Sequence, residues 1–301
     1  LHARACEVLR EAGAAVTGLD FLFTITPEQW ISKLDLRVIE SLRNYDLTFR
    51  QMLGTGGIVL VGSLLKGLDG EEDSLLLPHM DYLLSLPGLD LVSHIGLANL
   101  ETDRDGRVRR YVMEPLSNLP QDIAEDAPRL SFGALLALKA QGLAADQGPR
   151  DRAGRIVKPG HSARISYAGP PGTIPKISFY RLLEENALQD PEIQALRGRV
   201  VIVGGDFMGM NDVHDTPYRG TGGELMTGPE IQANIVETLL SGRVTAPVSG
   251  EIRVAVFLLF MAGTLALYRN LSPWAGLGVL AAACLATLLV AWALFREFLL
   301  F

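Results

Sequence analysis

The chain has 301 residues, of which 48% are hydrophobic, and its formal net charge is −7 at pH 7. Residues 252–301 contain only three arginines and one glutamate as charged residues, so residues 1–251 hold 24 basic and 33 acidic residues and a net charge of −9. An acidic domain repels phosphate backbones, which argues against nucleic acid as a partner. The two cysteines, Cys6 and Cys284, fall in a predicted soluble helix and a predicted membrane span, which argues against a disulfide framework and a cysteine metal site.

The N-terminal part of the chain alternates helix and strand signals. Apolar residues at helical spacing predict a helix over residues 1–12, and residues 14–23 have the composition of a mostly apolar strand. A capping threonine and a proline then predict a helix over residues 26–53, with a break near Asn44, before a short buried strand over residues 58–61. This alternation predicts an α/β fold with a mainly parallel sheet flanked by helices.

The middle of the chain adds one hairpin to this pattern. Residues 94–100 and 107–113 are strand candidates, and the Asp105-Gly106 pair between them is a strong hairpin turn signal. Residues 66–90 show no clear period. The later elements that the sequence predicts are a helix over residues 131–141, a short strand over residues 164–167, and two helices that begin at Ser178 and Asp190.

The most informative block runs from Arg199 to Leu240. Four apolar residues, 200–203, predict a strand that is buried on both faces. A polar, glycine-rich loop follows over residues 205–227, and Pro229 then opens an amphipathic helix. The apolar stripe of that helix consists of Ile231, Ile235 and Leu239.

The C-terminal tail has the composition of membrane helices. Residues 252–268 and 274–295 predict two transmembrane helices joined by a tight turn, and residues 298–301 predict the start of a third. We therefore expect the lipid bilayer to be a partner of the chain through residues 252–301. Because Leu1 falls inside a predicted helix and the chain ends inside an apolar run, we expect both ends to be truncations of a longer polypeptide.

Three separate segments share one family pattern. They are the stretch AGAAVTGLDFLF, the stretch IGLANLETDRDGRVRR, and the block that begins LRGRVVIVGG and continues through TGPEIQANIVETLLSGRV. Together they cover most of residues 1–247 in the family's order, and this region resembles the second type of CHASE domain, a sensory domain associated with cyclases and histidine kinases. That family tends to carry three consecutive membrane helices after the domain, which agrees with the predicted spans.

The resemblance implies a bacterial receptor that crosses the inner (plasma) membrane several times. Residues 1–250 would form a sensor domain outside the cytoplasm that binds an unknown small-molecule or protein ligand, and we expect a homodimer. The chain as given would not be an enzyme. An output enzyme, either an adenylate or guanylate cyclase, a Ser/Thr kinase or a histidine kinase, would follow after Phe301.

The polar loop before the last soluble helix carries the most suggestive side chains. Asp206, Asp212, His214 and Asp215 could bind a divalent cation, or His214 could act as a general base oriented by an aspartate. However, their spacing matches no metal motif, and aspartates in such loops commonly bond nearby backbone N–H groups. The sequence therefore favours an ordered loop and predicts no metal or cofactor, with ligand contact and catalysis as the alternatives.

A second argument brings several of these side chains near a ligand. In an open parallel sheet, ligands bind beyond the carboxyl ends of the strands, and three of the candidates each follow a predicted strand. Two more share one face of the last soluble helix, where Glu230 could serve the helix dipole and Asn234 could bond the loop backbone. The full set of ligand-binding candidates is Asp20, Ser63, Asp206, Asp212, His214, Asp215, Glu230 and Asn234.

Three functions fit the sequence. The leading one is a sensor domain that passes a small shift through the helix ending near Gly242 into the membrane helices. One alternative is a membrane-anchored metal-dependent hydrolase that uses the loop of Asp206, His214 and Asp215. The other is a structural module that dimerises through its membrane hairpin.

Overall fold

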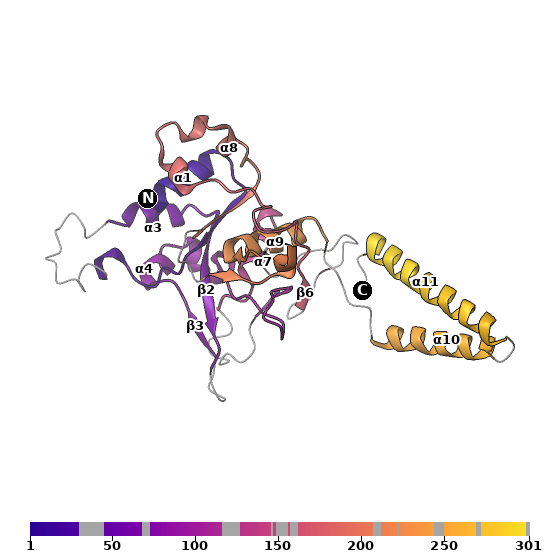
Figure 1. The fold of residues 1–301 in the computed structure, drawn as a ribbon. Helices are drawn as coiled ribbons and strands as arrows, with labels where there is room; N and C mark the ends of the chain where they lie inside the picture. Colours follow the sequence, from indigo (N-terminus) through magenta and orange to yellow (C-terminus); the bar gives the residue numbers. More distant parts are fainter. Residues whose placement is uncertain are drawn as a thin grey trace. The chain divides into compact units, whose positions relative to one another are not determined.

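The structure, a computed structural model, consists of two compact units, Leu1–Gly242 and Arg243–Phe301 (Figure 1). Part of the helix predicted over residues 26–53 and residues 299–301 of the predicted third span lie outside the residues that the structure describes. The described residues are 1–29, 45–67, 73–115, 127–145, 147–148, 156, 162–206, 212–221, 223–243, 250–268 and 272–298.

The first unit mixes helices and strands along its whole length. Its α-helices among the described residues are α1 (His2–Glu11), α3 (Leu47–Leu53), α4 (Met80–Leu83), α5 (Leu91–His94), α7 (Phe132–Ala140), α8 (Pro191–Gln194) and α9 (Gly228–Leu240). Its strands are β1 (Val16–Asp20), β2 (Ile58–Leu65), β3 (Ser74–Leu76), β4 (Ile95–Leu97), β5 (Arg110–Val112), β6 (Ser162–Arg164), β7 (Val200–Gly204), β8 (Val213–His214) and β9 (Met226–Thr227). Short 3-10 turns are η2 (Pro87–Leu89), η3 (Phe179–Leu183), η4 (Ala187–Gln189) and η5 (Pro217–Thr221).

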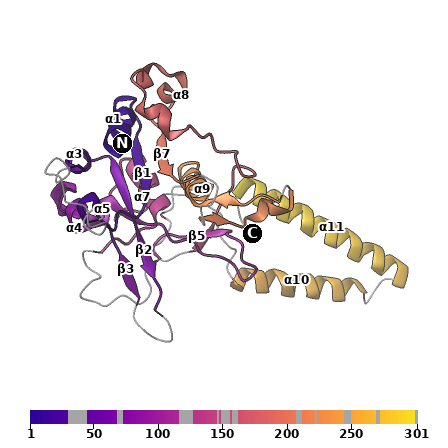
Figure 2. The same cartoon turned by 60° about the vertical axis from the view of Figure 1, so that its left-hand side comes forward.

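The largest sheet has a parallel centre (Figure 2). β1 lies between β2 and β7, with Leu19 opposite both Leu60 and Val203. Leu60 is also opposite Ile95, so β4 pairs with the other edge of β2, again in parallel. Only β3 runs antiparallel in this sheet, beside the end of β2. The predicted α/β fold with a mainly parallel sheet is confirmed.

The hairpin predicted over residues 94–113 is wrong in its pairing. The turn itself is present, because Gly106 has a φ of 77° and its N–H donates to the Asp103 carbonyl. However, β4 joins β2 in parallel, whereas β5 pairs antiparallel with β6. β4 is buried at every residue and fits the main sheet, while β5 exposes Arg110. A turn signal fixes the local chain reversal, and burial decides which strands pair.

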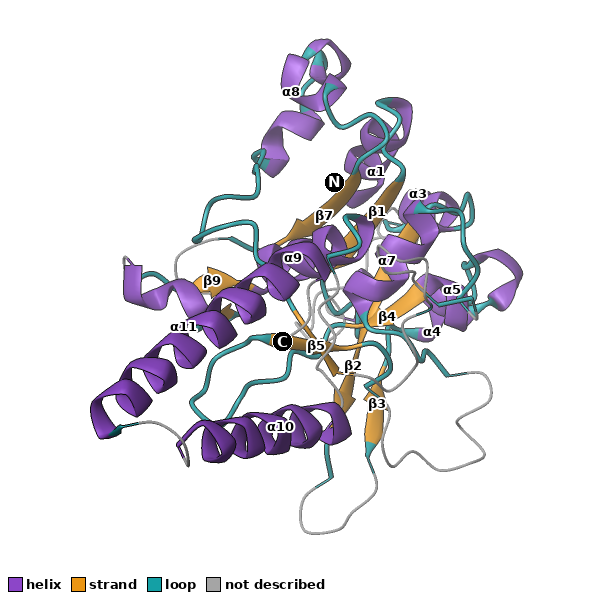
Figure 3. Ribbon diagram, turned by 90° about the vertical axis from the view of Figure 1, so that its right-hand side faces the viewer, coloured by secondary structure: helices purple, strands orange, loops and turns teal. Residues whose placement is uncertain are grey.

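Helices cover both faces of the main sheet. On one face, Leu9 of α1 and Leu53 of α3 are buried in one core cluster with Leu19 and Leu60 of the strands. On the other face, α7 and α9 lie side by side (Figure 3). Side chains in β1 alternate between the two faces, so Leu19 belongs to the α1 cluster while Gly18 faces α7.

Helix α7 approaches the sheet closely because glycines occupy the contacts. A Cβ at Gly18 would lie 2.6 Å from Phe132 Cζ, and a Cβ at Gly96 would lie 2.5 Å from Phe132 Cα. On its other side, a Cβ at Gly133 would lie 2.8 Å from Cγ2 of Ile235 on α9. The space between the sheet, α7 and α9 therefore has no room for one more methyl group at these positions.

Two of the predicted helices are shorter than the sequence indicated. The segment from Ser178 forms only the 3-10 turn η3, and the helix that opens at Asp190 ends at Gln194. A short helix is stable mainly through the apolar surface that it buries against the core. From the start of η3 to the start of β7, the buried apolar side chains are only Leu182, Ala187 and Ile193.

The second unit contains two long helices, α10 (Gly250–Tyr268) and α11 (Pro273–Phe298). Within the described part of the chain, one helix is long and apolar enough to cross a membrane, over Trp274–Ala293 with a mean hydropathy of 2.1. This segment coincides with the predicted second span. The spans over residues 252–268 and from residue 298 onward stay predictions.

We expect Gly96→Ala to destabilise the first unit, because the added methyl group would meet the Phe132 backbone and not a side chain that can turn away. Such overpacking lowers the free energy of unfolding by about 1–3 kcal/mol. Thermal unfolding of the full chain in detergent micelles measures the effect. Gly250→Ala is the matched control, since nothing lies within 4 Å of a Cβ at that position. Equal melting temperatures for Gly96→Ala and the wild-type chain would contradict the tight packing.

Candidate functional site

The carboxyl edge of the sheet meets the start of α9. Asp20 ends β1 and lies opposite Gly204, the last residue of β7. A Cβ at Gly204 would clash with the ring of Pro229 in the first turn of α9 and would lie 3.3 Å from Asp20 Cβ. Asp20, the end of β7 and the first turn of α9 therefore form one packed junction, at the edge where parallel sheets bind ligands.

Asp212 and His214 meet this junction from the loop before α9. His214 Nε2 lies 2.9 Å from Asp212 Oδ1, and β8, which contains His214, pairs with β9 directly before the helix. The Gly228 N–H donates to the Asp212 carbonyl at 3.0 Å, and a Cβ at Gly228 would clash with the Asp212 carboxylate. Asp212 is thus held against the first residue of α9, which supports the interpretation of this segment as an ordered loop.

The environment of Asp20 disfavours its charge. Burial raises the pKa of Asp20 to about 7, and the negative charge of Asp212 adds to the shift. Asp20 therefore changes its charge near neutral pH, at the point where β1 meets α9. The sequence pattern gave the position of Asp20 at a strand end but not this shift, because Asp212 is far away in the chain.

A lysine that no sequence pattern singled out connects two of the candidates. Lys176 Nζ lies 3.1 Å from Asp206 Oδ2 and 3.1 Å from Glu230 Oε2. The Glu230 side chain is 2% exposed, and its Oε1 accepts the Gly172 N–H at 2.7 Å. Glu230 therefore fastens the loop that contains Gly172, besides lying in the first turn of α9, where a carboxylate favours the helix dipole.

Two candidates lie apart from the junction. Asp215 faces arginines, with Oδ2 2.7 Å from Arg219 Nη1 and Oδ1 3.6 Å from Arg107 Nε. Ser63 does not follow β2 as the sequence predicted, because the strand continues to Leu65 and Ser63 pairs with β3. In the described part of the chain, neither residue is hydrogen-bonded or ion-paired to the side chains at the junction.

Helix α9 has a buried polar face beside its apolar stripe. Three of its side chains, four residues apart, accept backbone N–H groups from the chain that follows β6. Four residues of helix and two residues of extended chain both span about 6–7 Å, so Thr238 and Asn234 can meet alternate N–H groups, whereas the third N–H group, of Gly172, is four residues beyond Ala168. This polar ladder consists of Thr238 with Ser166, Asn234 with Ala168 and Glu230 with Gly172, at 2.9, 2.9 and 2.7 Å.

Gln232 fixes the middle of α9 to its neighbours. Its side chain is 1% exposed. Its Oε1 accepts the Gly133 N–H of α7 at 3.1 Å, and its Nε2 donates to the Ala98 carbonyl after β4 at 3.0 Å. Sequence reasoning missed Gln232, because a glutamine within a helix carries no signal of burial until its partners are known.

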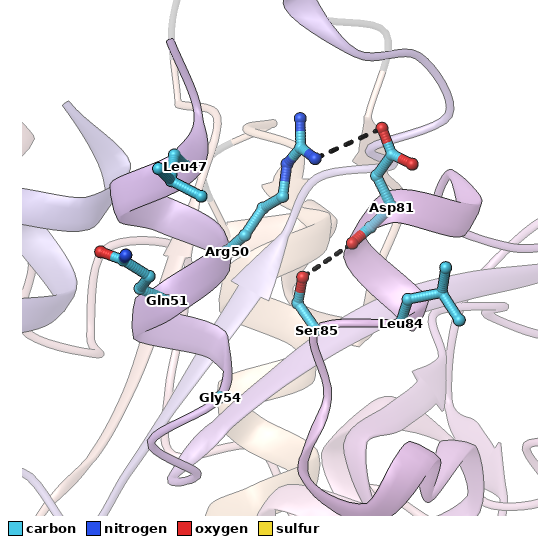
Figure 4. A pocket seen from close by; sticks show the side chains of 7 residues that line it. All are labelled: Leu47, Arg50, Gln51, Gly54, Asp81, Leu84 and Ser85. Atoms are coloured by element: carbon cyan, nitrogen blue, oxygen red, sulfur yellow. Dashed lines mark hydrogen bonds and ion pairs between the residues drawn. The ribbon is translucent and has the colours of Figure 1, made fainter. Parts of the chain in front are cut away.

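On the α3 side of the sheet, carboxylates surround one guanidinium. Arg50 Nη2 lies 2.6 Å from Asp46 Oδ1 and 3.6 Å from Glu28 Oε1, and Arg50 Nη1 lies 3.5 Å from Asp81 Oδ2. Figure 4 shows Arg50 on α3 and Asp81 on α4 pointing toward one another. We call these four residues the Arg50 cluster. The sequence analysis missed it because Glu28 and Asp81 come from separate segments of the chain.

Comparison with known proteins gives one family. The family model described as the CHASE2 domain matches residues 1–267, which includes the whole first unit and most of α10. This match confirms the resemblance that the sequence motifs indicated. No curated protein and no solved structure matches the chain.

We expect the stability of the first unit to fall as the pH rises from about 4 to about 7. The pKa of Asp20 rises from an ordinary 3.8 to about 7 on folding, so the folded chain binds this proton more tightly. The resulting stability is fully present below pH 3.8 and is lost as the pH passes through about 7. Asp20→Asn should therefore raise the melting temperature above pH 7, with a gain in free energy of up to about 4 kcal/mol.

Melting of the full chain in micelles between pH 4 and pH 8 tests this expectation. Glu237→Gln, on the exposed face of α9, is the control and should keep the wild-type profile. If Asp20→Asn shows the same pH profile as the wild-type chain, the raised pKa of Asp20 is wrong.

Proposed function

The chain belongs to the CHASE2 domain family, whose domains are extracytoplasmic sensors typical of signalling receptors, and from this premise we propose that it is the sensing part of a bacterial transmembrane receptor. It binds a ligand or a protein partner outside the cytoplasm. The signal passes to an output enzyme, a cyclase or a kinase, elsewhere in the same receptor. A CHASE2 domain is not catalytic by itself, so catalysis belongs to that enzyme.

The proposed layout divides the chain at the start of α10. Residues 1–250 form the sensor domain, and residues 252–268 and 274–295 cross the inner (plasma) membrane, with a third span that begins at residue 298. The exposed apolar side chains of α10 and α11 support this layout, since Phe257 and Leu288 are 61% and 68% exposed. Contact with lipid is more favourable than contact with water for exposed apolar side chains of this kind.

The observation that carries the proposal is the polar ladder of α9. The helix starts against Asp212 and the sheet edge, and it ends at Leu240, shortly before α10 begins at Gly250. Its buried hydrogen bonds bind it to the chain after β6 along three turns, so α9 moves as one body with that segment. A ligand that binds more tightly to one position of α9 and this segment increases the population of the receptor in that position. The start of the membrane helices would move together with α9.

The first unit offers two places for a ligand. One is the junction of Asp20, Asp212 and His214, with Asp206, Glu230 and Asn234 close to the same end of α9. The other is the groove between α3 and α4, beside the Arg50 cluster. The first controls α9 directly, because Asp212 touches its first residue.

The two alternatives have less support. A metal-dependent hydrolase needs a metal site, and among the residues that the structure describes no group of three His, Cys, Asp or Glu side chains is arranged to hold an ion. Asp215, which that hydrolase would use, faces two arginines instead. A structural module that dimerises through the membrane hairpin would be a homodimer, as the sensor would be. Among the described residues, no contact favours the structural module over the sensor.

Cysteine labelling in spheroplasts tests the membrane topology. In a Cys284→Ser background, Glu237→Cys on α9 should react with a membrane-impermeant maleimide in intact spheroplasts, because the sensor domain lies outside the cytoplasm. Ser272→Cys, between α10 and α11, should react only after the membrane is permeabilised, because one span precedes it. Both positions are exposed, so unequal access of the reagent to the folded protein does not confuse the result. Labelling of Ser272→Cys alone in intact spheroplasts would reverse the topology and contradict the proposal.

Asn234→Ala tests the coupling through the ladder. The variant leaves the Ala168 N–H without its acceptor, at a cost of about 1–3 kcal/mol, so the melting temperature should fall. It should also change the pattern of disulfide crosslinks between copies that carry single cysteines along residues 254–266. Glu237→Ala is the control, because Glu237 is exposed on the same helix and should change neither measurement. A lower melting temperature with an unchanged crosslink pattern would mean that the ladder stabilises the fold without passing a signal.

A further inference from the structure

The main sheet ends at β7, and this edge is open. β7 pairs with β1 on one side and has no second neighbour among the described strands (Figure 3). No backbone hydrogen bond from outside the sheet reaches residues 200–204 in the described part of the chain. The opposite side of the sheet is better protected, because the Leu97 N–H of β4 donates to the Leu130 carbonyl and β3 has only three residues.

One hydrogen bond fixes which backbone groups of β7 point away from the sheet. The Arg199 carbonyl accepts the Ala15 N–H at 2.9 Å, so the backbone groups of Arg199 face β1. These groups alternate sides along a strand, so Val201 and Val203 also face β1 while Val200 and Ile202 face outward. Within residues 200–203, the open edge therefore presents two N–H donors and two C=O acceptors.

The strand carries none of the features that keep natural edges from pairing. Such features include a proline, a charged residue within the strand and a bulge. β7 has the sequence VVIVG, without a proline or a charge. Val200, Val201 and Ile202 are half-buried, whereas four of the five residues of β1 are buried. Because side chains alternate between the two faces of a sheet, three half-buried neighbours indicate exposure at the edge and not one uncovered face.

We propose that β7 pairs antiparallel with β7 of a second copy of this chain, across a twofold axis at Val201. In this register Val200 lies opposite Ile202 of the other copy and exchanges two N–H···O=C bonds with it. The twofold axis repeats the exchange, so four hydrogen bonds satisfy both edges. The inference goes beyond the proposed function, which names no interface between copies, and it rests on that function only because a shared bilayer would hold the copies close together.

The charges at the ends of β7 favour this partner and this direction. Arg199 precedes the strand and is exposed, and Asp206 follows the strand with a side chain that is 54% exposed. Asp206 and Glu230 share the one ammonium group of Lys176, so the end of β7 keeps a net negative charge. An antiparallel copy places the basic start of each strand beside the acidic end of the other. A parallel copy would place like charges side by side.

Disulfide crosslinking of the full chain in membranes tests the register. In a Cys284→Ser background, Val201→Cys copies should crosslink when they are oxidised with copper phenanthroline, because Cα atoms in such a pair lie about 4.5 Å apart. Arg199→Cys is the matched control, since this exposed position would lie about 14 Å from its own copy. Its yield should be lower by about tenfold or more. Arg199→Cys and Val203→Cys should crosslink when they are coexpressed, because the register places each opposite the other.

Val200→Pro, combined with Val201→Cys, tests the backbone pairing itself. Proline removes the outward N–H from both copies, and the first residue of a strand tolerates it, so the melting temperature in micelles should stay unchanged. The crosslink yield should fall by about tenfold or more.

Three results would overturn the inference. The first is no disulfide in Val201→Cys, which would mean that the edge stays open or is covered by another segment or another protein. The second is an equal yield from Arg199→Cys alone, which random collisions in the membrane would give. The third is an undiminished yield in a folded Val200→Pro variant. None of these results touches the maleimide labelling, so failure of the interface is distinguishable from failure of the receptor function.

Discussion

The structure depends on one constraint, which is that α9 buries polar side chains as well as apolar ones. Glu230, Gln232, Asn234 and Thr238 are each at most 4% exposed, and every one of them has a hydrogen-bond partner in another segment. A buried amide or carboxylate without a partner costs far more than a bonded one gains. The chain after β6, the end of β4 and the start of α7 must therefore keep their positions for α9 to stay folded against the sheet.

Close packing and charge are concentrated in different parts of the first unit. The sheet and α7 are fixed by contacts at Gly18, Gly96 and Gly133 that leave no space for a methyl group. Charged groups lie elsewhere in the unit. Asp20 and Asp212 repel each other at one end of α9, and the Arg50 cluster holds excess negative charge on the other face of the sheet.

The sequence was sufficient for the fold class and for α9, and it was insufficient for contacts between distant segments. Strong periodic signals, such as the apolar stripe of Ile231, Ile235 and Leu239, predicted helices and buried strands that the structure contains. The Asp105-Gly106 turn was present, but local turn chemistry cannot tell which strands pair. Asp20 was found from its strand end, whereas Lys176, Gln232 and the Arg50 cluster were not. Their roles arise from partners that lie far away in the chain, and no spacing rule records such partners.

The polar ladder has a mechanical consequence through its period. Its acceptors repeat once per turn of α9, about 6 Å along the helix axis. A slide of α9 by a fraction of a turn would part Ser166 and Ala168 from their acceptors at the same time and offer no replacement. A slide of a whole turn would bring Asn234 to Ser166, but it would also part Gln232 from Gly133 and Ala98. The hydrogen bonds therefore fix the register of α9 against its neighbours, and any displacement along its axis must carry those neighbours with it.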